Sequence, residues 1–198
     1  MFKRTKGYFL LTMLVLTGLA GRIHSDTLSG KERRQLIAAL KQSKAELSAS
    51  LSGLSEKQLL YKPSAKEPSI RELIHSVAHA EAFLWQTAKS ALETPASALK
   101  ARPMPDAVVA TQVSVLLPAS VAGRTGSASA EEALKAFETT RTEVIRYVRT
   151  TTENVRNHLV NTPAGTMDAY QLMLTNALYT RHCLSEIEKR RSEPDFPR

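Results

Sequence analysis

Cysteine is almost absent from this sequence. Cys183 is the only cysteine among 198 residues, so an intramolecular disulfide is excluded and a folded domain must be stabilised by packing. Aromatic residues are also scarce, at 6%, yet 42% of the residues are hydrophobic, which is more than a disordered chain contains. The length suits one domain with a real hydrophobic core. We therefore expect a single folded domain that is poor in aromatics.

The first residues have the layout of a signal peptide. A basic start precedes an apolar run over residues 8–20, and Ser25 is a small residue at which a signal peptidase could cut. The run is shorter than the roughly 20 residues that cross a bilayer, so a retained membrane anchor is the weaker alternative. We interpret residues 1–25 as a signal peptide and residues 26–198 as the domain. The mature protein is then periplasmic or secreted, with no stable membrane span.

Charge of one sign is not concentrated anywhere in the predicted domain. The formal net charge is +8, but the predicted signal peptide accounts for four of the basic residues, which leaves 23 basic and 19 acidic groups, or +4. Lys and Arg alternate with Glu, as they do on solvated helix faces. Nucleic-acid binding is therefore not expected. A small molecule or another protein remains as the partner class, and homodimer formation is left open.

Helix-start signals divide the domain into four long segments. In a capping box, a short polar side chain and a Glu or Gln three residues later satisfy backbone N–H groups that a helix start leaves free. The pattern occurs at Ser29, Ser69, Ser129 and Asp168. Apolar residues then recur at helical spacing, giving each helix one apolar stripe. Trp85 follows the stripe of the second helix and should be buried. The sequence thus predicts an all-α four-helix protein.

The stretch from Thr94 to Ala128 separates the second helix from the third. Its four prolines and two glycines argue against a fifth long helix, and its best strand-like run, residues 108–117, has no neighbour of the same kind. A connection of this length can carry the chain along the whole bundle. We therefore expect a long crossover between helices 2 and 3.

Several short motifs in the domain occur in a characteristic order. They are Leu54–Leu59, Tyr61–Pro63, Ser69–Ile74, Glu81, Leu84–Trp85, Arg156–His158, Asp168–Gln171 and Glu193–Pro197. Together they resemble the DinB/YfiT-like family. The resemblance implies an up-down-down-up four-helix bundle in which three histidines bind a divalent metal such as zinc or nickel. Some members are thiol-dependent transferases or isomerases, but membership alone names no reaction.

Histidine is missing from the positions that the resemblance assigns to the metal. Alignment of the flanking motifs places the second-helix ligand on Ser76 and the fourth-helix pair on Tyr179 and Cys183. A degenerate site without metal is therefore expected. Tyr179 would then fill the space of the lost imidazole and metal, with Cys183 as a small buried hydrophobe.

The nearby histidines offer an alternative site. His75 and His79 are four residues apart, as a metal pair requires, and His182 is next to an aligned ligand position. However, one residue along a helix rotates a side chain by about 100°, which places His75 toward solvent. His79 remains a possible cleft-lining residue and could join Tyr179 and Cys183 in a poor three-donor site.

Two functions follow from these alternatives. The first is an exported binding scaffold for a small molecule or protein, with no catalytic residue and no cofactor. The second is a hydrolase or thiol transferase that uses zinc or nickel in an altered site. Whether the chain is an enzyme stays open. A role for His182 as a base for Cys183 is not favoured, because it points about 100° away around the helix, and His158 is expected to make a structural polar contact.

Overall fold

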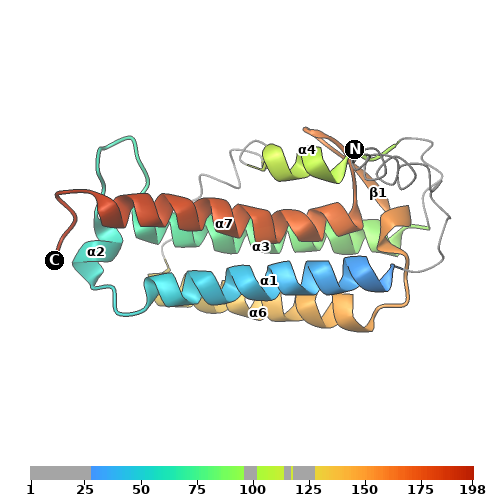
Figure 1. The fold of residues 1–198 in the computed structure, drawn as a ribbon, viewed down its shortest axis with the longest axis horizontal. Helices are drawn as coiled ribbons and strands as arrows, with labels where there is room; N and C mark the ends of the chain where they lie inside the picture. The colour runs from blue at the N-terminus through green and yellow to red at the C-terminus, as the bar shows by residue number, and fades with distance from the viewer. Residues whose placement is uncertain (1–27, 96–101, 114–116, 118–127) are drawn as a thin grey trace, which may run out of the picture.

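Four long helices lie side by side in the protein (Figure 1). The computed structural model describes residues 28–95, 102–113, 117 and 128–198, so the predicted signal peptide lies outside the described residues. The long helices are α1 (Gly30–Leu51), α3 (Ile70–Glu93), α6 (Ala130–Thr150) and α7 (Ala169–Ser192). No helix in the described part of the chain is long and apolar enough to cross a membrane.

The helix starts are set by local sequence. The predicted capping boxes are all present, with N-caps at Ser29, Ser69, Ser129 and Asp168. In α7, for example, the backbone N–H of Gln171 donates to the Asp168 carboxylate at 2.8 Å. A further box at Ser55 starts the short helix α2 (Glu56–Leu60). Each box satisfies N–H groups that a helix start would otherwise leave unpaired.

The helices run up, down, down and up, as the resemblance implies. At one end of the bundle, Arg33 near the start of α1 donates to the carbonyl of Thr151, directly after α6, at 2.8 Å. At the other end, Arg191 of α7 donates to the carbonyl of Ser50 in α1 at 3.2 Å. α1 is therefore antiparallel to α6 and parallel to α7, and α3 packs against both α6 and α7. The predicted long crossover joins opposite ends of the bundle (Figure 1).

A small hairpin between α6 and α7 was not predicted. A 3-10 turn, η1 (Val155–Asn157), leads into strands β1 (Leu159–Thr162) and β2 (Gly165–Asp168), which pair antiparallel. The turn ends at Gly165, whose φ of 128° is costly for any residue with a side chain. The strands are only four residues long, which is too short for a visible alternation of apolar residues.

The described part of the crossover is attached to this hairpin. The backbone N–H of Met104 donates to the carbonyl of Thr166 in β2 at 2.9 Å. A short helix, α4 (Asp106–Thr111), follows directly. The strand-like run at residues 108–117 is therefore helical over its first residues, which form the end of α4.

Trp85 is buried, as the stripe of α3 predicts. Its ring lies 5.3 Å from the ring of Tyr147 in α6, and its indole N–H donates to the Glu143 carboxylate at 3.3 Å. The apolar ring thus packs into the core while its one polar atom reaches a partner at the rim. This contact joins α3 to α6.

The centre of the bundle holds a charged residue, Arg141 of α6. Its side chain has no solvent exposure and forms a bidentate ion pair with Glu81 of α3, at 2.8 and 2.7 Å. The remaining N–H groups reach the Leu40 carbonyl and Ser43 hydroxyl of α1, and the Thr180 hydroxyl of α7, at 2.7 to 2.9 Å. One guanidinium therefore contacts all the other long helices.

Removal of this guanidinium should be strongly destabilising. We expect Arg141→Met to lower the free energy of unfolding by about 3–5 kcal/mol, because it leaves the Glu81 carboxylate buried and unpaired. The double variant Arg141→Met/Glu81→Leu should be less destabilised than Arg141→Met alone. Arg146→Met, which changes an exposed arginine of the same helix, should stay within about 0.5 kcal/mol of the unmodified protein. Urea unfolding measures all three.

The pH dependence of Arg141→Met tests the same contact. Burial raises the pKa of the Glu81 carboxyl, and Arg141 opposes this rise. Without Arg141 the folded-state pKa lies above its unfolded value, so the folded state binds the extra proton. Glu81 should therefore destabilise the variant, relative to the unmodified protein, less below about pH 4.5 than near neutral pH. If Arg141→Met destabilised the protein equally below pH 4.5 and near neutral pH, the Glu81 carboxylate would be solvated in the variant.

Candidate functional site

The three residues at the aligned ligand positions come together between α3 and α7. The Ser76 hydroxyl of α3 and the Tyr179 hydroxyl of α7 share a hydrogen bond of 2.7 Å. Cys183 is one turn further along α7, on the same side of the helix as Tyr179. All three side chains are buried. The structure thus places a serine, a tyrosine and a cysteine where the resemblance implies three histidines.

The cluster is electrically neutral at physiological pH. Burial raises the pKa of the Cys183 thiol to about 12, although the hydrogen bond from Tyr179 opposes the rise. Burial also raises the pKa of Tyr179 well above its usual range, with a further rise from Cys183 and an opposing effect of the Ser76 hydrogen bond. Both groups keep their protons at neutral pH, so the cluster is a set of hydrogen-bonding hydroxyl and thiol groups.

This donor set does not fit a divalent metal. Zinc and nickel bind neutral imidazole or deprotonated thiolate, so both buried protons would have to leave and the Ser76–Tyr179 hydrogen bond would have to break. Across residues 28–95, 102–113, 117 and 128–198, no group of three or more His, Cys, Asp or Glu side chains is placed to hold a metal ion.

The prediction that His75 faces solvent is wrong. Its side chain is only 3% exposed, and Nε2 lies 2.9 Å from the carbonyl oxygen of Ala128. The argument from helical rotation took no account of the chain that enters α6, where the Ala128 carbonyl meets His75. His75 is therefore held by a backbone contact, away from Tyr179 and Cys183.

The other histidines lie around the cluster or far from it. His182 borders it, with its ring 6.0 Å from the ring of Tyr179, and is partly buried. His79 is also partly buried, one turn along α3 from Ser76. His158 is buried at the opposite end of α3, where Nδ1 lies 3.1 Å from the carbonyl oxygen of Ala91. This backbone contact agrees with the structural role expected for His158.

A second polar cluster surrounds Arg156 at the end of the bundle where α7 starts. The guanidinium lies 3.7 Å from the ring centre of Tyr170 and pairs with Asp168, the N-cap of α7, at 3.1 Å. It also pairs with Asp106 of α4 at 2.7 Å and Glu32 of α1 at 3.0 Å. Two of the motifs that carry the resemblance, Arg156–His158 and Asp168–Gln171, therefore serve to fasten α4 and the start of α1 to α7.

Arg141 is the residue that sequence reasoning missed. It lies four residues after Phe137 and three before Val144, on the apolar stripe of α6. A charged residue at a stripe position is expected to be buried and to need a buried partner of opposite charge. The position of Arg141 on the stripe therefore indicated a buried charge. Glu81, four residues after Val77 on α3, indicated the buried partner of opposite charge.

These observations define a class of protein. It is a four-helix bundle with up-down-down-up topology and a buried polar cluster between α3 and α7. A protein-family model described as the DinB superfamily matches residues 39–187. The chain belongs to the DinB superfamily. No curated protein matches the sequence.

Among solved structures, the chain is similar to YfiT from Bacillus subtilis. That protein is described as a probable metal-dependent hydrolase with an unusual four-helix bundle topology. The match has a TM-score of 0.59 and 15% sequence identity, and it covers 84% of this chain and 91% of the other. At this identity the similarity shows a shared fold.

The protonated, buried state of Cys183 predicts slow reaction with a thiol reagent. At pH 8, a thiol of pKa about 12 holds about 1000-fold less thiolate than an ordinary one. The folded protein should therefore react with 5,5′-dithiobis(2-nitrobenzoate) only as fast as it unfolds. A Ser185→Cys variant adds an exposed thiol on the same helix and should show one fast and one slow equivalent. Fast reaction of the unmodified protein would place Cys183 in an accessible site.

Proposed function

We propose that this chain is an exported member of the DinB superfamily that binds a small molecule or a protein partner without the three-histidine metal site. The observation that carries the proposal is the hydrogen bond between Ser76 and Tyr179, with Cys183 beside them. These groups take up the positions of the three ligands and satisfy one another. They leave no deprotonated donor in the cluster, because Tyr179 and Cys183 keep their protons.

The alternative is a hydrolase or thiol transferase that uses zinc or nickel in an altered site. It draws support from the description of YfiT as a probable metal-dependent hydrolase and from Cys183, a soft ligand when deprotonated. Elemental analysis of protein purified without a histidine tag separates the two functions. Stoichiometric zinc or nickel would favour the alternative.

Restoring the three histidines should create a metal site. The side chains of Ser76, Tyr179 and Cys183 converge, so Ser76→His/Tyr179→His/Cys183→His would place three imidazoles where a fourth, water ligand can complete a common zinc shell. Zinc at about 100 times its Kd should raise the Tm of this triple variant by about 5–10 °C, because a ligand that binds only the folded state stabilises it.

The Tm measurement has two controls. The unmodified protein should show no zinc-dependent rise, and the double variant Tyr179→His/Cys183→His should show a smaller one, since it lacks the ligand from α3. Nickel should act in the same direction as zinc. A zinc response of the unmodified protein equal to that of the triple variant would contradict the proposed loss of the site.

Export is tested separately at the N-terminus. The basic start, short apolar run and small residue at Ser25 support cleavage there. We expect the native protein to begin close to Asp26 and to fractionate outside the cytoplasm. N-terminal sequencing of protein from the producing cell makes the measurement. Soluble protein that still begins at Met1 would be inconsistent with export.

A further inference from the structure

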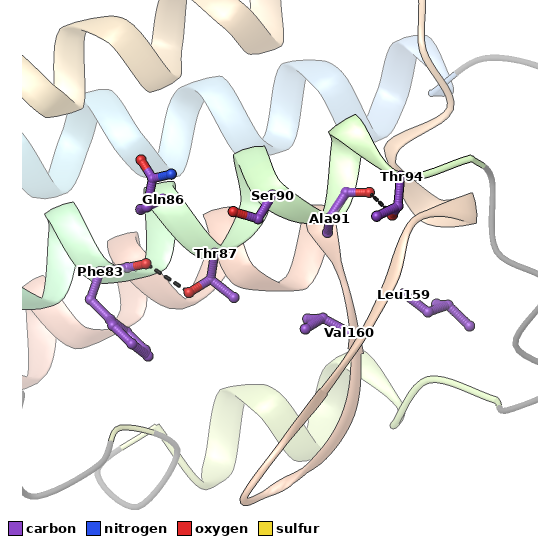
Figure 2. Close-up of a pocket in the computed structure, with 8 residues that line it drawn as sticks. All are labelled: Phe83, Gln86, Thr87, Ser90, Ala91, Thr94, Leu159 and Val160. Carbon is purple, nitrogen blue, oxygen red and sulfur yellow. Dashed lines mark hydrogen bonds between the residues drawn. The ribbon is translucent and has the colours of Figure 1, made fainter.

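A groove separate from the Ser76 cluster runs along the C-terminal half of α3 (Figure 2). One wall is formed by α3, which contributes Phe83, Gln86 and Ser90 among others, and Leu159 and Val160 of β1 form the opposite side. Its cavity volume is about 380 Å³, within the range of small-molecule sites. The groove exists because the hairpin turns back against α3 after α6.

The lining is apolar and carries no charge. Phe83 is 41% exposed and is one of two large hydrophobic side chains on the surface of the described residues. Leu159 and Val160 of β1 also line the groove, and each is only partly buried. An exposed aromatic ring next to aliphatic side chains in a concave surface gains free energy when a ligand removes it from water. The walls therefore favour an apolar body.

A few polar groups lie along the same wall. The hydroxyls of Thr87 and Thr94 donate to carbonyls of their own helix, at 2.8 and 2.6 Å, so only their acceptor lone pairs face outward. Gln86 and Ser90 are one turn apart, and both are exposed. A ligand with one polar group could therefore form a hydrogen bond at this edge, so that its polar group is not buried without a partner.

The groove also has a fixed relation to the candidate site. Ser76, Phe83, Thr87 and Ser90 follow one another on α3 at intervals of seven, four and three residues, so they share one face of the helix. The groove therefore starts two turns from Ser76 on the face that carries the former metal position.

We propose that this groove binds a small, uncharged, mostly apolar molecule with a single hydrogen-bonding group. The apolar body lies between Phe83 and the β1 side chains, and the polar group meets Gln86 or Ser90. This inference rests on the proposed binding function and gives it a place and a ligand class. An ion or a highly charged metabolite is disfavoured because the lining offers no side chain of opposite charge.

The probe for a direct test is N-phenyl-1-naphthylamine, which is uncharged, mostly apolar and has one N–H group, as the lining requires. Its fluorescence rises in apolar surroundings. We expect saturable binding to the purified protein with one probe per chain. The variant Ser90→Trp fills the groove from its exposed wall and should weaken binding at least tenfold. Ser185→Trp places the same side chain on an exposed part of α7 and should change binding less than twofold.

Two further variants test the contacts individually. Phe83→Ala removes the exposed ring and should weaken binding about tenfold, and it provides a second measurement if Ser90→Trp does not fold. The double variant Gln86→Leu/Ser90→Ala should weaken binding of the amine about fivefold, the value of one hydrogen bond. It should leave binding of 1-phenylnaphthalene, which has no N–H, within twofold.

The outcomes separate the groove from the proposed function. Absence of binding to the unmodified protein, as expected if another segment of the chain fills the groove, overturns the inference. Binding that resists both Ser90→Trp and Phe83→Ala overturns it as well, because the probe then sits elsewhere. Stoichiometric metal together with groove-dependent binding would instead contradict the metal-free function and leave the groove assignment standing.

Discussion

The ion pair between Arg141 and Glu81 constrains everything else in this bundle. A guanidinium without solvent exposure is tolerated only where every N–H group has an acceptor, and here the acceptors come from α1, α3 and α7. Each helix must therefore keep its rotation and its register. Thr180 points at Arg141, so the preceding residue, Tyr179, is rotated by about 100° around α7, which brings its hydroxyl to Ser76 on α3. The rotation of α7 that the Arg141 contacts fix therefore also sets the geometry of the Ser76, Tyr179 and Cys183 cluster.

The same interior keeps the Ser76, Tyr179 and Cys183 cluster protonated. A metal site needs donors without protons and a path for water, whereas burial here holds the protons on Tyr179 and Cys183. Hydrogen bonds within the cluster satisfy these groups where they would otherwise be costly to bury. Small neutral side chains thus fill a position that three imidazoles and a metal would fill in the family pattern. The result is a buried, hydrogen-bonded contact between α3 and α7.

Features encoded by neighbouring residues were predictable from the sequence, and features that depend on distant segments were not. The capping boxes at Ser29 and Ser69 act within one turn, so the helix starts could be read directly, and the stripe of α3 placed Trp85 in the core. The burial of His75 could not be read in this way, because the carbonyl of Ala128 approaches it from the far end of the crossover. The groove depends on where β1 meets α3, and strands of four residues leave no periodic signal. Arg141 differs from these cases, since its stripe position already pointed to a buried charge.

The polar contacts that join distant segments of this chain do not all involve the Ser76, Tyr179 and Cys183 positions. Two sets of long-range polar contacts, Arg141 to Glu81 in the core and Arg156 to Asp106 and Asp168 at the end of the bundle, lie outside the three aligned ligand positions. In a protein whose folding energy comes from metal binding, loss of ligands unfolds the domain. The contacts of Arg141 join all four long helices, so they fix the register of the helices from positions other than Ser76, Tyr179 and Cys183. The groove along the C-terminal half of α3 is shaped by α3 and the hairpin. The contacts of Arg141 and Arg156 hold these two elements in place.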